Sequence, residues 1–356
     1  MKIYLLNSVF KSNATGGNIL NSILINVFNT LGKNHIIAVT DEFLGIKNNT
    51  FEKIISYWKK WKKIAEADVI VAPSSNRRLC FFLNFLRRKN RKITIMVIHH
   101  HFAYLTFKKY SIKRLLTKFY EMNILKAADI IVTPGQYAYD MTCRYFEKDK
   151  VFFTGVPISK KETESSRHEQ GMLVFLGNVI PRKGIHYLIE ALGNVTSDYH
   201  MLIAGDYSNK KYYSKLISLA KKNGSIKNIE FLGRISDEQK EKLLQKAYVF
   251  VFPTLNEGYG IVMLEAMGHG VPVIAFNNSS VPYIVEHKKN GLLVKNRDVN
   301  DLAEKISYVL NNSDSVSCMG EYALRTYENA ETVDEYKDKI RELYTLIVEI
   351  SKNKNT

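Results

Sequence analysis

The stretch Phe250-Val-Phe-Pro-Thr-Leu-Asn-Glu-Gly-Tyr-Gly-Ile-Val-Met-Leu-Glu-Ala-Met-Gly-His-Gly270 decides the fold. It begins at the end of a buried strand, predicted over residues 248–252, and passes through a proline and a polar turn before Glu257-Gly258-Tyr259-Gly260 opens a helix. Glycines at such a turn let a ligand approach the main chain, and the unpaired N–H groups of the helix start favour an anion. Helical side chains tilt towards the N-terminus, so we expect Glu257 and Glu265 to border a group held there. A diphosphate between hydroxyl-rich units suits these amides and carboxylates.

Two further glycine loops follow predicted strands. Gly16-Gly17 lies between a strand at residues 2–7 and an apolar helix predicted over residues 19–31. The loop Gly177-Asn-Val-Ile-Pro-Arg-Lys-Gly184 follows a strand at residues 172–177. This loop matches neither the dinucleotide fingerprint nor the P-loop, so neither mechanism is inferred from it.

The stretch from Phe250 closely resembles the signature of family-four retaining glycosyltransferases (glycosyl transferases group 1), with two glutamates separated by seven residues. The resemblance implies the GT-B fold, an α/β architecture of two facing Rossmann-like domains with a deep interdomain cleft. It predicts an N-terminal acceptor-binding domain at residues 1–160 and a C-terminal nucleotide-sugar donor-binding domain at residues 168–334. A last helix, at about residues 335–352, is expected to return to the first domain.

The same resemblance implies site residues. Glu257 would hold the transferred sugar, Glu265 the ribose hydroxyls, and Lys183 the diphosphate. Asn178 replaces the family's usual arginine, and Arg182 is a candidate to supply that charge. A histidine after the strand at residues 92–98 is expected to point into the cleft, with His99 the best match and His100 the second. The remaining predicted donor contacts are Gly17, Arg234, Gly258, Tyr259, Gly260 and Ile261.

A metal site is not expected. His99-His100-His101 alternate along an extended chain, so at most two share a face, and no cysteine or carboxylate lies nearby in sequence. The sequence also lacks the D-x-D motif of the metal-dependent GT-A alternative. We therefore expect no cofactor, and a UDP- or GDP-linked sugar as co-substrate.

Charge is distributed unevenly along the 356 residues. Residues 1–160 hold 26 of the 51 lysines and arginines but only 10 of the 35 acidic residues, and so carry the whole net charge of +16. Three segments there, residues 53–65, 77–92 and 107–125, place aromatic or apolar side chains beside basic ones. Such segments are typical of interfacial membrane helices, although each also fits an ordinary helix that buries its apolar face. Three scattered cysteines and the lack of a long apolar run favour a cytoplasmic protein, peripheral at the inner face of the cell membrane.

The sequence thus predicts a metal-independent, hexosyl-type retaining glycosyltransferase acting on a glycan or lipid-linked acceptor. Cell-surface polysaccharide, lipopolysaccharide or glycolipid synthesis is the expected context. Two alternatives remain open: a nucleotide-sugar epimerase of the same fold, and a basic nucleic-acid-binding protein. No nucleic-acid-binding module is recognised, so no nucleic-acid partner is expected.

Overall fold

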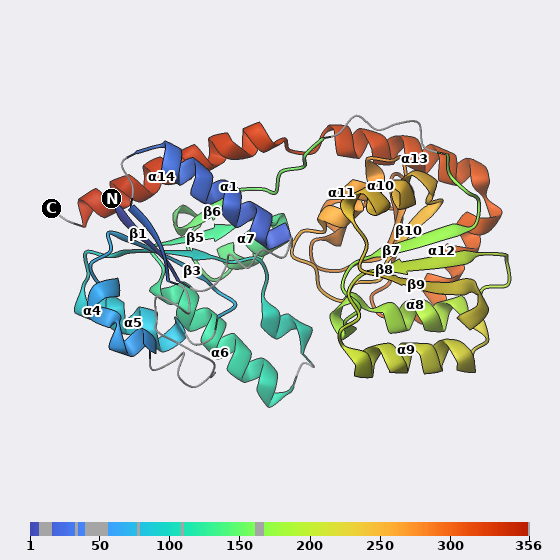
Figure 1. Cartoon of the computed structure of the whole chain (residues 1–356), viewed down its shortest axis with the longest axis horizontal. Coiled ribbons are helices and arrows are strands. Elements are labelled where there is room, and N and C mark those ends of the chain that lie inside the picture. The colour runs from blue at the N-terminus through green and yellow to red at the C-terminus, as the bar shows by residue number, and fades with distance from the viewer. Residues whose placement is uncertain are drawn as a thin grey trace. The chain divides into compact units, whose positions relative to one another are not determined.

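The structure, a computed structural model, describes residues 1–6, 16–32, 35–39, 56–76, 79–107, 110–160 and 167–354. The chain divides into two compact units (Figure 1). Unit 1 comprises Met1–Pro157 and Glu331–Thr356, and unit 2 comprises Ile158–Ala330. The chain therefore passes between the units twice, after Pro157 and after Ala330.

Unit 1 is built on a parallel sheet. Among its described residues the strand order is β2 (His35–Val39), β1 (Lys2–Leu6), β3 (Val69–Pro73), β4 (Thr94–Ile98), β5 (Ile130–Thr133) and β6 (Val151–Phe153). Every residue of β3 and β4 is buried, because helices cover both faces of the sheet. Figure 1 shows α1 (Gly16–Thr30) and α14 (Val333–Asn353) on one face, and α4 (Trp61–Ile64), α5 (Leu79–Lys89) and α6 (Ile112–Ala127) on the other. The unit also holds α7 (Gln136–Cys143) and the 3-10 helices η1 (Ala103–Thr106) and η2 (Lys148–Lys150).

The C-terminal helix α14 is an integral part of unit 1. Its buried face is formed by Tyr336, Ile340, Leu343 and Ile347. The ring of Tyr344 meets Phe28 of α1 edge to face, with centroids 5.3 Å apart. Beyond the helix, Lys354 pairs with the buried Asp129 carboxylate at 2.5 Å.

Unit 2 repeats the architecture. Its strands run in the order β12 (Gly291–Val294), β11 (Val273–Phe276), β10 (Val249–Phe252), β7 (Met172–Leu176), β8 (His200–Ala204) and β9 (Ile229–Gly233), and all pair in parallel. The helices are α8 (Ile185–Leu192), α9 (Lys210–Lys222), α10 (Asp237–Lys246), α11 (Ile261–Met267), α12 (Val299–Asn311) and α13 (Ser313–Glu328), with 3-10 turns η3 (Pro181–Lys183), η4 (Ser225–Asn228) and η5 (Val281–Tyr283). Phe175, Phe250 and Phe252 lie at the centre of its core, and Phe252 stacks on both of the others.

One predicted boundary is wrong. The helix expected over residues 19–31 begins at Gly16, so Gly16 and Gly17 form its first turn and not a loop before it. First-turn N–H groups have no partner within the helix, so small residues are tolerated there without loss of side-chain packing. No helix in the described part of the chain is both long enough and apolar enough to cross a membrane.

Candidate functional site

The strand order of unit 2 defines where a ligand binds. From β7 the chain builds the sheet outwards through β8 to β9, and from β10 in the opposite direction through β11 to β12. The neighbours β7 and β10 therefore flank the topological switch point, where open α/β sheets bind ligands at the carboxyl ends of their strands. The two loops that leave this point are residues 177–184 and 253–260.

These two loops are locked together by the main chain. The N–H of Leu255 donates to the carbonyl of Arg182 at 2.8 Å. Gly184, which caps α8, has φ +70°, and a Cβ there would lie 1.8 Å from the carbonyl oxygen of Pro253. Only glycine permits this backbone angle and this contact, so the sequence of one loop fixes the position of the other.

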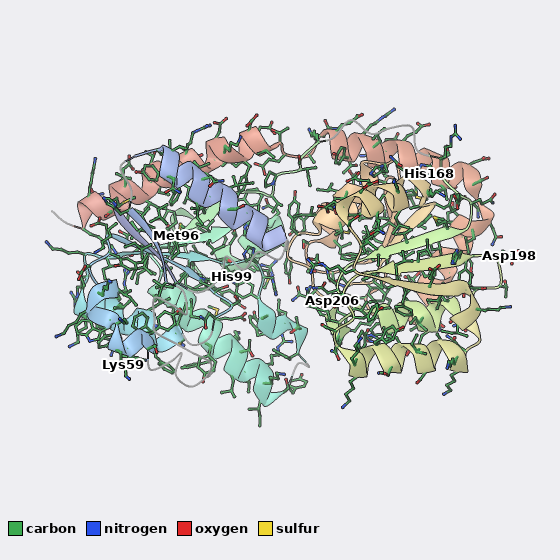
Figure 2. All side chains as sticks on the ribbon, viewed as in Figure 1. Lys59, Met96, His99, His168, Asp198 and Asp206 are labelled. Carbon is green, nitrogen blue, oxygen red and sulfur yellow. The ribbon has the colours of Figure 1, made fainter. Side chains whose placement is uncertain are left out.

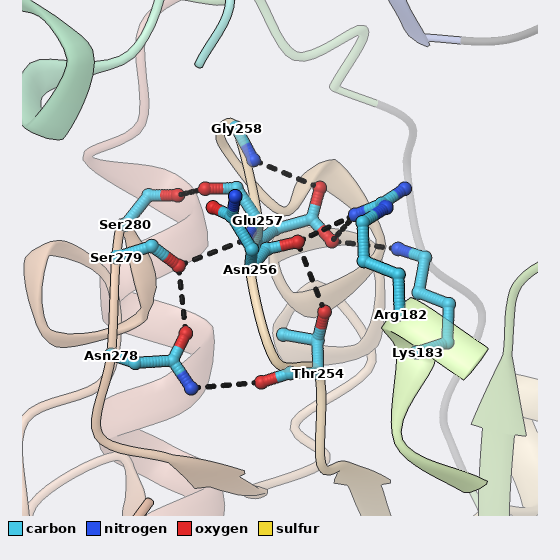
Figure 3. Close-up of polar contacts among 9 residues, drawn as sticks. All are labelled: Arg182, Lys183, Thr254, Asn256, Glu257, Gly258, Asn278, Ser279 and Ser280. Atoms are coloured by element: carbon cyan, nitrogen blue, oxygen red, sulfur yellow. Dashed lines mark hydrogen bonds and ion pairs between the residues drawn. The ribbon is translucent and has the colours of Figure 1, made fainter. Parts of the chain in front are cut away.

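Glu257, Lys183 and Arg182 meet where the loops join (Figure 3). The Lys183 ammonium lies 2.6 Å from Glu257 Oε2 and 4.5 Å from the centroid of the Phe252 ring. The Arg182 guanidinium lies 3.8 Å from the same carboxylate oxygen and donates to the carbonyl of Asn256 at 2.5 Å. The three side chains keep 32% (Arg182), 12% (Lys183) and 14% (Glu257) of their surface exposed, so a ligand reaches Arg182 most easily.

Burial and neighbouring charge have opposing effects on the pKa values of Glu257 and Lys183. Burial favours the protonated Glu257 carboxyl, but Lys183 and Arg182 outweigh this effect and hold its pKa below the ordinary value. Burial lowers the pKa of the Lys183 ammonium, and the attraction of Glu257 only partly offsets it. With all three groups ionised the cluster carries one net positive charge, which suits an anionic ligand such as a diphosphate.

A third loop, the one after β11, positions Glu257 through its backbone. The Glu257 N–H donates to Ser279 Oγ at 2.9 Å, and Ser280 Oγ donates to the Glu257 carbonyl at 2.5 Å. Ser279 in turn donates to Asn278, whose amide donates to the Thr254 carbonyl (Figure 3). The sequence motifs give these serines no role. These serines could have been recognised as site residues because they follow β11, a strand that lies next to β10 at the switch point.

Asn256 is a second residue that the sequence reasoning missed. Its side chain is 3% exposed, and neither its amide nitrogen nor its amide oxygen has a hydrogen-bond partner among the described residues. A buried amide without partners costs free energy, so a ligand or water hydrogen bond here would be strongly favoured.

Glu265 does not join the cluster. It lies on α11 and pairs with Lys240 of α10 at 2.7 Å. Burial alone would lower the pKa of Lys240, but the contact with Glu265 raises it. The structure thus places the two glutamates of the motif in separate ion pairs, and periodicity along one helix gives no sign of a partner on another.

The other predicted donor residues lie around the two loops. The Gly258 N–H donates to Glu257 Oε1 at 3.2 Å, and Gly260, with φ +95°, caps α11. Tyr259 and Ile261 are half-buried, and Arg234 is exposed directly after β9. Asn178 is exposed beside Gly177, in a loop held by a hydrogen bond from the Val179 N–H to the Asp206 carbonyl. Figure 2 shows Asp206 just beyond β8.

The predicted residues of unit 1 lie at the end of β4 and on α1. His99 has no exposed surface, its Nδ1 lies 2.8 Å from Ser74 Oγ, and burial lowers its pKa to about 3 (Figure 2). His100 is half-buried and keeps some exposed surface, and burial lowers its pKa to about 4. Both imidazoles are therefore neutral at pH 7. In the described part of the chain no three His, Cys, Asp or Glu side chains cluster in a way that would hold a metal ion.

A comparison with protein families shows which family unit 2 matches. A sequence model of the family "Glycosyl transferases group 1" matches residues 158–326, which is almost the whole of this unit. Residues 158–326 belong to the group 1 glycosyltransferases. The family resemblance predicted from Glu257, Glu265 and Lys183 is therefore confirmed.

Curated relatives match about half of the chain. A glycosyltransferase of Methanocaldococcus jannaschii is 33% identical over 171 residues, covering 48% of this chain and 46% of its own length. A GDP-mannose-dependent alpha-(1-6)-phosphatidylinositol monomannoside mannosyltransferase of Mycobacterium tuberculosis is 31% identical over 43% of this chain and 41% of its own. The chain spans about half the length of the curated relatives that it matches.

Solved structures match both units. Sucrose-phosphate synthase from Thermosynechococcus elongatus has a TM-score of 0.80 at 17% identity, over 98% of this chain and 99% of its own. Anabaena HepE, solved in complex with UDP and glucose, has a TM-score of 0.74 at 18% identity, over 97% of this chain and 99% of its own. The predicted fold, GT-B with two Rossmann-like domains, is confirmed.

Proposed function

We propose that the protein transfers a hexose-type sugar from a nucleoside-diphosphate sugar to a hydroxyl acceptor, with retention of configuration. The observation that carries this proposal is the Arg182–Lys183–Glu257 cluster at the switch point of a group 1 domain. Its two cations suit a diphosphate, and its carboxylate suits sugar hydroxyls. The mannosyltransferase relative is named for a GDP-sugar, and HepE was solved with UDP, which supports a donor of this class.

The cations provide the catalytic driving force in this proposal. As the bond between the anomeric carbon and the β-phosphate breaks, its electron pair goes to the phosphate oxygen, and Arg182 and Lys183 stabilise the added charge without a metal ion. Preorganised charges of this kind act most strongly where water is excluded, and Lys183 is largely buried. Asn256 and the Gly258–Ile261 turn complete the donor contacts, and Glu265 would hold the ribose once its pairing with Lys240 is exchanged.

Retention is proposed from the resemblance to the retaining family. Because Glu257 is engaged with Lys183 and Arg182, and so is poorly placed to act as a covalent nucleophile, the proposed route is front-face attack. We propose that the acceptor oxygen forms its bond to the anomeric carbon on the face that the diphosphate leaves. The acceptor's proton passes to the departing phosphate oxygen. His99, the best match to the family's histidine, and His100, which is partly exposed, are the proposed residues of unit 1 near the transferred sugar, and both are neutral.

The proposed acceptor is a glycan or lipid-linked glycan bound by unit 1, in the synthesis of a surface polysaccharide, lipopolysaccharide or glycolipid. The net positive charge of residues 1–160 would attract anionic phospholipid, which supports the proposed location at the inner face of the cell membrane. The mannosyltransferase relative is named for a phosphatidylinositol-linked acceptor, which supports this assignment.

The donor assignment is tested in two stages. A thermal-shift screen with UDP-, GDP-, ADP- and CMP-sugars first identifies the donor, because a ligand that binds only the folded state raises its melting temperature. Donor hydrolysis is then measured for wild type, Lys183→Ala and Glu257→Gln, with Lys222→Ala, an exposed lysine of α9, as the matched control. Both site variants are expected to lose about 100-fold or more in kcat, and the control to lose nothing.

Wild-type rates in both site variants would rule out the cluster as the donor site. Retention is tested separately by the anomeric configuration of the transfer product, and an inverted product rules it out. Incorporation of labelled sugar into organic-extractable lipid tests the acceptor class, and label found only in water-soluble product contradicts a lipid-linked acceptor.

A further inference from the structure

Helix α6 of unit 1 presents its apolar face to solvent. Ile112, Leu115, Leu116 and Phe119 have exposed fractions of 75%, 64%, 51% and 51%. Positions three and four apart lie on the same side of a helix, so these four side chains form one strip. We call it the α6 outer face. The sequence left open whether this strip is buried in the protein, and the structure places it outside.

The opposite side of the helix explains this orientation. It buries two polar residues, Thr117 and Glu121, beside Ile124 and Leu125. The Glu121 carboxylate accepts hydrogen bonds from the N–H groups of Ala103 at 2.8 Å and Tyr104 at 3.1 Å, which are the first residues of η1. Turning the helix to bury the outer face would expose Ile124 and Leu125 and break both bonds. The outward orientation is therefore fixed by contacts with the rest of unit 1.

The apolar surface continues onto the neighbouring helix. Phe81 of α5 is 57% exposed, and its ring meets Tyr120 edge to face at 6.1 Å. Tyr120 meets Phe119 at 5.6 Å, and so connects Phe81 to the α6 outer face. Just before α6, Tyr110 is 87% exposed. Five large exposed apolar or aromatic side chains thus lie on two packed helices, with a sixth, Tyr110, next to them in sequence, and exposed apolar groups of this size mark interaction surfaces.

Charge identifies the occupant. By helical spacing Lys113 and Lys118 border the outer face, whereas Arg114 lies on the inner side over the Tyr104 ring. Residues 1–160 also carry the net charge of the chain. A second copy would bring the same positive charge to the contact and be repelled, whereas an anionic lipid surface is attracted. Apolar side chains on one face of a helix with basic side chains beside it are what an interfacial membrane helix requires.

We propose that the α6 outer face inserts into the interfacial region of an anionic phospholipid bilayer, with the flanking basic residues at the level of the headgroups. The inference deepens the proposed function, because it names the surface through which the enzyme would reach a membrane-anchored acceptor. It does not depend on the donor site, which lies in the other unit.

The experiment is vesicle flotation with the full-length protein. Phosphatidylcholine vesicles with and without phosphatidylglycerol are compared for wild type and for Leu115→Asn/Leu116→Asn, which changes apolar area and leaves the charge unchanged. The matched control is Tyr308→Asn/Tyr322→Asn, two exposed aromatic residues of unit 2. Each replacement removes most of the free energy gained when a leucine side chain moves from water into the bilayer, and is expected to weaken binding about tenfold. The double variant is therefore expected to bind about 100-fold more weakly.

We expect wild type and the control variant to float with the anionic vesicles. The leucine variant is expected to remain unbound. Equal recovery of the leucine variant and wild type overturns the proposal, as does a wild type that floats with neither vesicle. A wild-type dimer in sedimentation that the leucine variant abolishes also overturns it, and assigns the face to a second copy. Both leucines are solvent-exposed, so the variant is expected to keep the wild-type melting temperature. Donor hydrolysis, measured in parallel, separates failure of the surface from failure of the donor site.

Discussion

Breaking the ion pair between Lys183 and Glu257 is expected to destabilise unit 2 by an amount that the geometry allows us to estimate. At 2.6 Å, and with an effective dielectric constant of about 20, the gross attraction is about 6 kcal/mol. Desolvation cancels much of this, and removing one partner of a buried pair typically costs about 3–5 kcal/mol. Because both side chains keep some exposed surface, we expect about 3 kcal/mol for Glu257→Gln, which leaves two cations without their carboxylate.

The two partners are not equivalent. Lys183→Met leaves Glu257 with Arg182 at 3.8 Å, so its expected cost is about half as large. The double variant Lys183→Met/Glu257→Gln is expected to cost less than the sum of the two, because it leaves no unpaired charge from the pair. For a domain of this size 3 kcal/mol corresponds to a fall of about 6–12 °C in melting temperature.

The assay is calorimetry combined with tryptophan fluorescence. The sequence has two tryptophans, Trp58 and Trp61, and both lie in unit 1, so fluorescence reports unit 1 alone. The calorimetric transition of unit 2 is expected to fall while the fluorescence transition stays in place. The reasoning is refuted if Glu257→Gln lowers the melting temperature of unit 2 by less than about 2 °C, or if the two single effects simply add in the double variant.

Three further predictions concern other parts of the chain. Because the pKa of His99 is about 3 in the fold and 6.5 ordinarily, its contribution to stability is complete above pH 6.5 and is lost as the pH falls towards 3. His99→Gln should flatten that decline in fluorescence-monitored unfolding, and an unchanged slope would contradict a buried neutral imidazole. Ser279→Ala removes the acceptor of the Glu257 N–H and should slow donor hydrolysis about tenfold. Recovery is expected in Ser279→Asn, which keeps a side-chain acceptor and tolerates the positive φ of this position; equal rates in all three proteins would argue against a positioning role. Ile340→Ala on α14 should destabilise unit 1 by about 2–4 kcal/mol, while the exposed Glu342→Ala should change little; a shift confined to the calorimetric transition of unit 2 would contradict the place of α14 in unit 1.

Much of unit 2 could be predicted from local chemistry. A buried strand, a proline, a polar turn and a glycine-capped helix follow one another between Phe250 and Gly270, and each step is a short-range preference that the sequence displays directly. Lys183 and Arg182 were predicted from the resemblance of their loop to that of the family, and the loop follows a strand of the same sheet. Contacts between such loops depend on strand order, and the parallel α/β pattern restricts that order strongly.

The remaining features depend on contacts between distant segments. Ser279 and Ser280 form an ordinary polar turn in sequence, and only the position of β11 next to β10 brings them to the backbone of Glu257. Lys240 pairs with Glu265 because α10 lies near α11, which no periodicity predicts.

Helix α6 illustrates a further limit of periodicity. The pattern correctly predicts which side chains share a face, but it does not say whether that face is buried in the protein. The buried Glu121, held by two main-chain N–H groups of η1, turns the opposite face inwards.

The placement of α14 has a consequence for how the chain is made. Unit 1 needs this helix to cover α1, yet roughly 170 residues of unit 2 must be translated first, which takes about 10–35 s at typical rates of synthesis. During that interval the nascent N-terminal segment lacks α14, whose residues Tyr336, Ile340 and Leu343 are buried in the finished unit. Unit 2, which is continuous in sequence, has no such delay. The unit translated second is therefore the first that is free to complete its fold.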